Sequence, residues 1–347
     1  MSDSRSAPDH PAPHATVLFL CLSLAACAGP DLRLPHSDHY DGAHFFTPGA
    51  PQPQGFGGVL KWMFSRQHGA WRDYQDFPPG PKPPERVADL RVTFVNHATS
   101  LIQMNGLNIL TDPIWSYRCS PVSFAGPARA RPPGIRFEDL PPIDVVLVSH
   151  NHYDHLDLPT LQRLRRERGA PRILTGLGNG ELLKNAGIAP IDELDWWESR
   201  EIAPGVKITA VPVQHFSNRG LTDRNRTLWT GFVVSGPAGN VFFAGDTGFG
   251  PHFEAIAKRF GPIRLAVLPI GAYRPEWFMG PVHETPAQAA EAQRQLGAAT
   301  ALAIHFGTFP LADDGQDEPI EDLHKALAAH PDQRFWVLGF GEGRDVP

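Results

Sequence analysis

The sequence predicts an α/β protein in which two mixed β-sheets pack face to face and helices cover the outer faces. From Arg91 onward, short apolar runs typical of strands alternate with segments of helical spacing. Hairpin and βα connections are both expected in each half of this region, so the two halves look alike. Two such halves bury their apolar faces by packing sheet on sheet. We therefore expect one domain over residues 91–347.

Strands and helices alternate along the predicted domain. The first strands are expected at RVTFV, TSLIQM and LNILTD, with Asn105-Gly106 as a hairpin turn, and a buried strand is expected at DVVLVS. Later strands are expected at RILTG, VKITAVPV, TLWTGFVVSG, NVFFAGD, RLAVLPIG, ALAIHFG and RFWVLGFG. Helices are expected at LPTLQRLRRERG, GNGELLKNAG, HFEAIAKRFG, TPAQAAEAQRQLG and PIEDLHKALAAH.

The composition disfavours a nucleic-acid partner and a disulfide framework. The chain has 347 residues and a net charge of −6, without a long basic run. A nucleic-acid binder usually carries a basic stripe, so this class is disfavoured. Three cysteines are too few for a disulfide framework, and the lack of Cys-x-x-Cys argues against thiolate zinc sites. The 36 prolines and 33 glycines predict many loops and short helices.

Residues 1–29 predict a targeting segment. The apolar run from Ala15 to Gly29 is short for a bilayer span but suits the core of a signal peptide. Its end, LAAC, is similar to a bacterial lipobox with Cys27 as the lipidated residue. We expect a lipoprotein of the bacterial cell envelope. Because Arg5 is the one basic residue before this run, a later start codon and a cytoplasmic, peripherally membrane-bound protein stay open as alternatives.

Residues 30–90 predict an N-terminal arm followed by an amphipathic helix. Residues 30–55 are rich in Pro, Gly and His, which is typical of an extended arm. The next segment, GFGGVLKWMFSRQ, has four apolar residues at helical spacing: Val59, Leu60, Met63 and Phe64. This helix either docks on the core or presents an apolar surface to lipid, and both interpretations stay open.

The densest cluster of potential ligands lies in VSHNHYDHLDL, residues 148–158. It contains His150, His152, Asp154 and His155, where a buried strand gives way to a helix. Residues at strand ends have fixed backbones and exposed side chains, so ligands can be preset there. His150 and His152 can point the same way if the strand persists, while Asp154 and His155 can reach a second point nearby. Imidazole and carboxylate groups favour zinc, with iron or manganese as alternatives.

Three more candidate ligands follow apolar runs further along the chain. His215 follows TAVPVQ, Asp246 follows VFFAG and His305 follows ALAI, as a shared sheet edge demands. A carboxylate such as Asp246 can bridge two metals. The prediction is two zinc ions per chain, bridged by Asp246. One is held by His150, His152 and His215, and the other by Asp154, His155 and His305.

This motif set resembles the metallo-β-lactamase superfamily, whose fold is an αββα sandwich. The resemblance covers the chain from about Gly55 to the C-terminus. More narrowly, several segments resemble N-acylphosphatidylethanolamine-hydrolysing phospholipase D, a two-zinc phosphodiesterase that releases phosphatidic acid and an N-acylethanolamine. They are VLKW, NHATSLIQM, LTDPIWS, LPPIDVVLVSHNHYDHLD, ELDWWE, FFAGDTGFGPHFEAIAKRFGP, LPIGAYRPEWFM and AIHFGTF.

The resemblance implies roles for further residues. It implies that the seven residues above are zinc ligands, and that His283 in FMGPVHETP is an additional active-site histidine. His97 and Asp112 then orient ligands from behind. Two positions depart from the family pattern. Val282 stands where the animal enzyme has a polar side chain, which puts head-group recognition in doubt, and Asn96 replaces a glycine before HAT.

The expected reaction is attack of a metal-bridging hydroxide on phosphorus, opposite the leaving alkoxide. Asp154, Asp246 and His283 are the expected catalytic residues, and Cys119 is not placed as a nucleophile. A dinuclear metal hydrolase of a soluble ester or lactone is one alternative, and a non-catalytic metal-binding surface lipoprotein is another. A true β-lactamase is disfavoured because a bridging Asp246 is not the usual second-site ligand of that class.

A phospholipid substrate and a membrane surface are the expected partners, and formation of a homodimer stays open. Aromatic residues near the proposed ligands form either part of the core or an acyl-chain groove. They are Trp115, Tyr117, Trp229, Phe249, Tyr273, Trp277 and Phe278.

Overall fold

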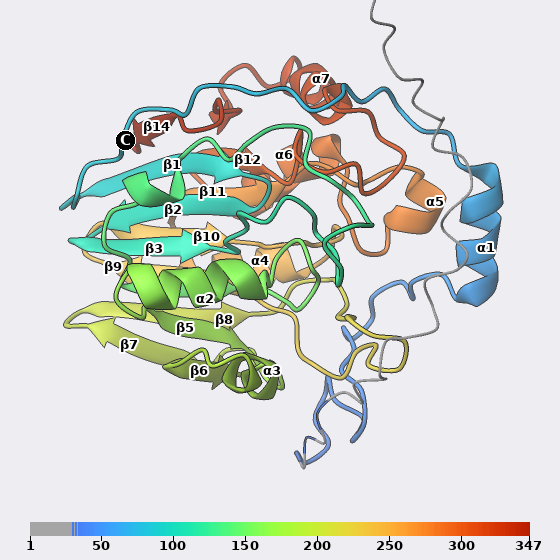
Figure 1. Ribbon diagram of the computed structural model, residues 1–347, viewed down its shortest axis with the longest axis horizontal. Coiled ribbons are helices and arrows are strands. Elements are labelled where there is room, and N and C mark those ends of the chain that lie inside the picture. Colours follow the sequence, from blue (N-terminus) through green and yellow to red (C-terminus); the bar gives the residue numbers. More distant parts are fainter. Residues whose placement is uncertain (1–29, 31, 33) are drawn as a thin grey trace, which may run out of the picture.

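The computed structural model describes residues 30, 32 and 34–347. Within these residues, two seven-stranded mixed sheets lie face to face and helices cover their outer sides (Figure 1). The predicted fold class is therefore confirmed. The expected signal segment, residues 1–29 with Cys27, lies outside the described residues.

The first sheet combines the early strands with one strand from the C-terminus, in the order β14-β1-β2-β3-β4-β5-β6. Neighbouring strands from β14 to β3 are antiparallel, and those from β3 to β6 are parallel. The bounds are β1 (Leu90–Asn96), β2 (Thr99–Met104), β3 (Leu107–Thr111), β4 (Val145–Val148), β5 (Arg172–Gly176), β6 (Ile191–Leu194) and β14 (Gly343–Asp345).

The second sheet has the order β13-β12-β11-β10-β9-β8-β7. Strands from β7 to β10 are antiparallel and those from β10 to β13 are parallel, the same division as in the first sheet. This is the likeness between the two halves that the sequence predicts. The bounds are β7 (Ser199–Ala203), β8 (Val206–Val211), β9 (Gly231–Gly236), β10 (Gly239–Phe243), β11 (Ile263–Pro269), β12 (Thr300–Ile304) and β13 (Phe335–Trp336).

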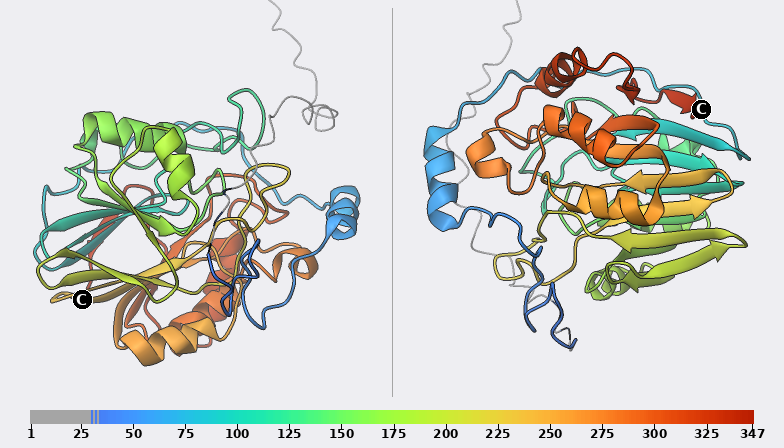
Figure 2. Two further views of the ribbon diagram at one scale, coloured as in Figure 1. Left: turned by 90° about the horizontal axis from the view of Figure 1, so that it is seen from below. Right: turned by 180° about the vertical axis from the view of Figure 1, so that it is seen from behind.

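Short helices cover both outer faces (Figure 2). Leu161 and Leu164 of α2 pack with Val146 of β4 in one apolar cluster. The bounds are α1 (Phe56–Ser65), α2 (Leu158–Glu167), α3 (Gly180–Asn185), α4 (His252–Phe260), α5 (Glu276–Met279), α6 (Pro286–Gln295) and α7 (Glu318–Leu327), with a 3₁₀ turn at Phe137–Asp139. None of the helices in the described part of the chain is long and apolar enough to cross a bilayer.

The main core lies between the two sheets. Val92 and Ile102 of the first sheet share one buried cluster with Val233, Phe242 and Leu268 of the second. Every residue of β2 is buried. One face of this strand meets the other sheet and the other face is covered from outside, which explains why its sequence lacks a clean alternation of apolar and polar residues.

The predicted hairpin turn joins β2 and β3. Asn105 and Gly106 have φ angles of +52° and +77°. A two-residue hairpin of this kind needs positive φ at both central positions, and Asn-Gly is the pair that adopts it most readily. The prediction is confirmed in its position and in its backbone conformation.

Several short elements differ from the expected pattern. The edge strands β6, β7 and β14 have the sequences IDEL, SREIA and GRD. Charged edge strands resist pairing with other molecules, but they also lack the apolar pattern that identifies a strand. Of the segment RFWVLGFG, the structure forms only the two-residue β13. The expected arm also packs on the body, because Tyr40 and Phe45 belong to the main core.

Helix α1 contacts the body along one side and exposes apolar residues on the other. The Trp62 ring stacks on Phe278 with centroids 4.8 Å apart, and Arg66 Nε donates to Asp313 Oδ1 at 2.7 Å. Phe56 and Phe64 are 77% and 89% exposed. Figure 1 shows α1 standing at the edge of the molecule beside α5.

We expect replacement of Asp322 with asparagine to lower the free energy of unfolding by about 1–2 kcal/mol at pH 7. Burial disfavours the charged form of Asp322, but hydrogen bonds from Lys325, Tyr273 and Arg274 outweigh it and lower the pKa to about 2. The unfolded chain has the ordinary value near 3.8. The stabilisation is therefore present above about pH 4 and is lost as the pH falls towards 2.

Urea unfolding of the Asp322→Asn variant at pH 7 and at pH 3 measures this difference. The matched control is Asp332→Asn, a change at an exposed carboxylate, which we expect to shift stability by no more than about 0.5 kcal/mol. An equal loss in the Asp322 variant at both pH values would show that this carboxylate acts through packing and not through its charge.

Candidate metal centre

Segments that follow four strands bring the predicted site residues together. HNHYDH, residues 150–155, follows β4 of the first sheet. His215, Asp246 and His305 follow β8, β10 and β12, which run in one direction in the second sheet. The carboxyl ends of these strands share an edge, which explains how residues far apart in sequence reach one place.

The first group contains three imidazoles. His150 Nε2 lies 2.8 Å from His152 Nδ1, and His215 Nε2 lies 3.3 Å from the same Nδ1 atom. The three potential donor atoms lie within 4.8 Å of one another. Burial lowers the pKa of His150 and His215 well below the ordinary value, so both rings are neutral at pH 7. Neutral imidazole is the form that binds a metal.

The second group contains a carboxylate and two imidazoles. Asp154 Oδ2 lies 3.2 Å from His155 Nε2 and 3.5 Å from His305 Nε2. His97 Nε2 lies 3.0 Å from the same oxygen. His97 Nε2 thus contacts the Asp154 carboxylate directly, and it belongs with Asp154, His155 and His305 to one group of potential donor atoms within 4.8 Å of one another.

Asp246 lies between the two groups. Its Oδ2 atom is 3.0 Å from His155 Nε2 and 3.2 Å from His305 Nε2. The same oxygen is 3.9 Å from His150 Nε2 and 3.8 Å from His215 Nε2. A single carboxylate therefore approaches imidazoles of both groups, which is the arrangement a bridging ligand requires.

Hydrogen bonds of Asp112 fix the orientation of one candidate ligand. Asp112 Oδ2 lies 2.7 Å from His155 Nδ1, and the backbone N–H of Ser149 donates to Asp112 Oδ1 at 2.7 Å. Gly245 passes so close to Ser149 that an added Cβ would lie 2.5 Å from the serine Cβ, so this position requires glycine.

Backbone strain marks the same place. His97, Asp112 and His305 have positive φ angles of 46°, 31° and 63°. Residues other than glycine rarely adopt this conformation, and where they do, the strain is concentrated at functional sites.

The donor set fits a pair of cations. His155 Nε2, His305 Nε2 and Asp246 Oδ1 are buried without a hydrogen-bond partner among the described residues. Although burial opposes protonation, nearby carboxylates, chiefly that of Asp246, raise the pKa of His305 to about 9 and that of His155 well above the ordinary value. The carboxylates thus require positive charge at this point, which protons or divalent metal ions can supply.

His283 lies beside both groups. Its ring centroid is 5.1 Å from that of His215 and 5.4 Å from that of His305. His283 Nδ1 is buried without a hydrogen-bond partner among the described residues. The neighbouring Val282 is buried, and its carbonyl oxygen accepts a hydrogen bond from His215 Nδ1 at 2.9 Å.

Comparison with known proteins agrees with this geometry. Residues 107–306 match the model of the β-lactamase superfamily domain. The chain belongs to the metallo-β-lactamase superfamily. It is accordingly a hydrolase of the metallo-β-lactamase fold, and its His/Asp clusters are suited to binding metal.

Two curated relatives of this superfamily member are phospholipases. The chain is 40% identical to N-acyl-phosphatidylethanolamine-hydrolyzing phospholipase D 1 of Caenorhabditis elegans over 266 residues. This alignment covers 73% of this chain and 75% of the relative. The chain is 35% identical over 237 residues to the mitochondrial enzyme of that name from Saccharomyces cerevisiae, covering 67% of this chain and 50% of that relative.

A solved structure supports the fold alone. Igni18, a metallo hydrolase from the archaeon Ignicoccus hospitalis, superimposes with a TM-score of 0.55 at 23% identity. The similarity covers 74% of this chain and 97% of Igni18.

A cavity of about 400 Å³ opens onto the metal centre. Its floor includes Asp154, Asp246 and His305, and His283 also lines it. The apolar part of its wall includes residues of α1, α5 and the segment after His215, among them Val59, Trp62, Phe216, Phe278 and Met279.

The sequence pattern does not identify all residues that line this cavity. Of the seven aromatic residues proposed for an acyl-chain groove, Phe278 alone lines the cavity, whereas Trp229 and Phe249 pack in or against the main core. Trp62 and Phe216 line the cavity instead. Arg224 also lines it, and no ion pair of its guanidinium occurs among the described residues. Arg224 is exposed and lies in a loop without periodicity, so no sequence pattern identifies it as a residue that lines the cavity.

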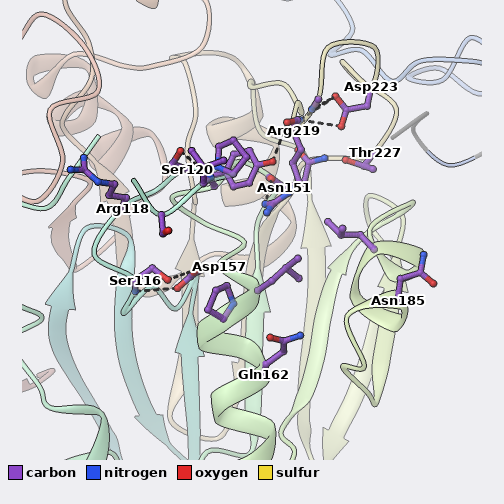
Figure 3. A pocket seen from close by; sticks show the side chains of 18 of the residues that line it. Ser116, Arg118, Ser120, Asn151, Asp157, Gln162, Asn185, Arg219, Asp223 and Thr227 are labelled. Carbon is purple, nitrogen blue, oxygen red and sulfur yellow. Dashed lines mark hydrogen bonds between the residues drawn. The ribbon is translucent and has the colours of Figure 1, made fainter. Parts of the chain in front are cut away.

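A second, larger cavity of about 820 Å³ has the lining drawn in Figure 3. Tyr153 is the residue that lines both cavities. Its hydroxyl donates to the Arg219 carbonyl at 3.2 Å, and the Arg219 guanidinium lies 3.8 Å from the Tyr153 ring centroid. Arg219 Nη1 also donates to the carbonyls of Asn151 and Leu156, both at 2.8 Å. These contacts hold the Tyr153 side chain in place.

Proposed function

We propose that the chain is a dinuclear zinc phosphodiesterase that hydrolyses N-acylphosphatidylethanolamine-type phospholipids to phosphatidic acid and an N-acylethanolamine. The observation that carries the proposal is the position of Asp246 between two ligand groups at the base of an apolar-walled cavity. The similarity to two phospholipases that act on this lipid class supports the choice of substrate.

The proposed ligands follow from the two groups. One zinc ion is assigned to His150, His152 and His215. The other is assigned to Asp154, His155 and His305, and Asp246 contributes to both. When bound, the two ions lower the pKa of a water molecule and neutralise charge on phosphoryl oxygens. An imidazole-rich set with two carboxylates suits zinc, and iron or manganese are compatible with the same donors.

The chain itself orients the candidate ligands and supplies a cavity with an apolar wall. Asp246 fixes the spacing of the two groups, and His97 holds Asp154 in place. His283 is assigned to the substrate phosphate or the leaving oxygen, since its unpartnered Nδ1 belongs to a ring in the cavity wall. The buried Val282 side chain leaves no polar group for the head group at that position, so recognition there falls to His283.

The cavity wall matches an anionic lipid. Trp62, Phe278 and Met279 offer apolar contacts for an acyl chain, and Arg224 at the cavity supplies a positive charge for a phosphodiester. The acidic net charge of the whole chain does not oppose this, because the local field is set by Arg224 and by the metal pair.

We further propose that α1 docks the enzyme on a membrane surface, because its exposed phenylalanines lie on the helix whose Trp62 lines the cavity. Lipidation of Cys27 in the cell envelope would supply a second anchor, and a cytoplasmic, peripheral enzyme is the alternative. Labelling intact cells with a radioactive fatty acid tests the anchor, since a Cys27→Ala variant should lose the label.

The double variant Phe56→Ser/Phe64→Ser is expected to bind lipid vesicles about tenfold more weakly or worse. Two phenylalanines that enter the interface lose apolar burial when replaced by serine. Vesicle co-sedimentation measures the effect. Turnover of a short-chain, monomeric substrate should not change, which controls for folding. Unchanged sedimentation of the double variant would exclude α1 as the docking element.

A substrate panel tests the proposed activity. The zinc-loaded protein is incubated with vesicles of N-acylphosphatidylethanolamine, with a soluble phosphodiester and with a lactone. We expect equal amounts of phosphatidic acid and N-acylethanolamine from the vesicles. Hydrolysis of the lactone without hydrolysis of the lipid would favour a soluble ester or lactone substrate. Tight zinc binding without any turnover would favour a non-catalytic lipoprotein.

A further inference from the structure

His305 lacks the support that three other histidines of the metal centre have. His155 Nδ1 is held by Asp112, His215 Nδ1 by the Val282 carbonyl, and His150 Nδ1 lies 2.9 Å from Ser149 Oγ. A metal-binding histidine almost always hydrogen-bonds through its other ring nitrogen, which fixes the ring and its tautomer. His305 Nδ1 is buried without a hydrogen-bond partner among the described residues.

A small void lies beside this histidine. It measures about 10 Å³ and is lined by His305, Asp314, Trp71 and apolar neighbours. Asp314 is 5% exposed, and its Oδ2 accepts the backbone N–H of Ala272 at 3.1 Å. Asp314 Oδ1 is buried without a hydrogen-bond partner in the described part of the chain. His305 and Asp314 therefore line the same void, and each has a buried atom without a hydrogen-bond partner. The His305 atom is a donor and the Asp314 atom is an acceptor.

The size and polarity of the void select its occupant. A void must measure at least about 10–15 Å³ to hold one water molecule, and such a water normally bridges buried polar groups. A buried polar group without a hydrogen-bond partner is destabilising, so a water molecule in the void removes two such penalties. A metal ion is excluded by the scarcity of ligands, because His305 and Asp314 are the two side chains at the void with an unpartnered atom.

We propose that one water molecule bridges His305 Nδ1 and Asp314 Oδ1, and that Asp314 is thereby the positioning residue of His305. The proposal rests on the proposed role of His305 as a zinc ligand. The chain of contacts is carboxylate, water, imidazole and metal, and it parallels the direct contact from Asp112 to His155.

The N-terminal segment holds Asp314 in position. Trp71 Nε1 donates to the Asp314 carbonyl at 2.9 Å, and the backbone N–H of Gln316 donates to the Ala70 carbonyl at 2.9 Å. The adjacent Asp313 pairs with Arg66 just after α1. Residues 66–71 thus close the void and connect the exposed helix α1 to the support of a zinc ligand.

A crystal structure of the zinc-loaded wild-type protein at high resolution tests the water directly. We expect one ordered water within hydrogen-bonding distance of both His305 Nδ1 and Asp314 Oδ1. A void filled by a rearranged side chain, or a direct contact between the two residues, would overturn the proposal. Because this experiment uses the wild-type protein, its result does not depend on whether a variant folds.

Zinc titration against a competing chelator tests the role of Asp314. The Asp314→Asn variant is expected to bind one of its two zinc ions about 10- to 100-fold more weakly, with the other unchanged. The matched control is Asp332→Asn, which makes the same change at an exposed carboxylate and does not line the void. It should bind both ions with wild-type affinity.

The outcomes separate the two proposals. If the wild-type protein binds two zinc ions and both variants match it, Asp314 does not position His305, while the metal centre stands. If both variants weaken zinc equally, the effect is one of general packing and the proposal fails. If the wild-type protein binds no zinc, the proposed metal centre itself fails.

Discussion

Replacement of Asp246 with asparagine is expected to lower kcat/KM for the lipid phosphodiester by about 10³-fold or more. The Asp246 carboxylate approaches imidazoles of both ligand groups, from 3.0 Å at His155 Nε2 to 3.9 Å at His150 Nε2. An amide of the same shape keeps the packing but removes the negative charge that joins two cations. The variant should also lose part of its zinc, which elemental analysis measures alongside turnover.

The Asp332→Asn variant is the control for this experiment, because it removes an exposed carboxylate with the same change of charge. It should retain wild-type activity and two zinc ions. If Asp246→Asn also retained full activity with two zinc ions, the bridging role would be excluded, whatever the identity of the substrate.

Removal of metal is expected to abolish activity and to lower the free energy of unfolding by about 3–4 kcal/mol relative to protein in excess zinc. Without a metal ion, only protons on His155 and His305 balance the buried carboxylates of Asp154 and Asp246. Chemical denaturation of chelator-treated protein, with and without added zinc, measures the difference. Zinc, iron and manganese are then added back separately, and the ion that restores turnover at stoichiometric amount is the functional one.

The control for metal removal is treatment with the same chelator that has first been saturated with zinc, which should leave stability and activity unchanged. An equally stable and fully active protein after complete removal of metal would contradict the dinuclear centre.

The sequence brings the candidate ligands to one place because each of them is tied to a regular element. His215, Asp246 and His305 follow apolar runs, and strands of one direction bring their ends to the same edge of a sheet. The dense motif from His150 to His155 follows the buried strand β4 in the same way. Local pattern and sheet geometry therefore suffice to place these residues near one another.

The cavity wall is less predictable because it depends on tertiary packing. Trp62 reaches the cavity from α1, and Phe216 and Arg224 reach it from a segment without periodicity. Trp229 looks equally suitable in sequence, but its ring is buried in the core and its Nε1 donates to the Val213 carbonyl at 3.0 Å. No pattern in one sequence distinguishes an aromatic residue that faces a cavity from one that faces the core.

The most direct measurement is the position of ¹⁸O after hydrolysis of N-acylphosphatidylethanolamine vesicles in ¹⁸O-labelled water. Attack on phosphorus places one ¹⁸O atom in the phosphate of phosphatidic acid and none in the N-acylethanolamine, and this is the result we predict. Label in the N-acylethanolamine, or in a released fatty acid, would show that a carbon–oxygen or acyl bond is broken instead, and would contradict the proposed phosphodiesterase.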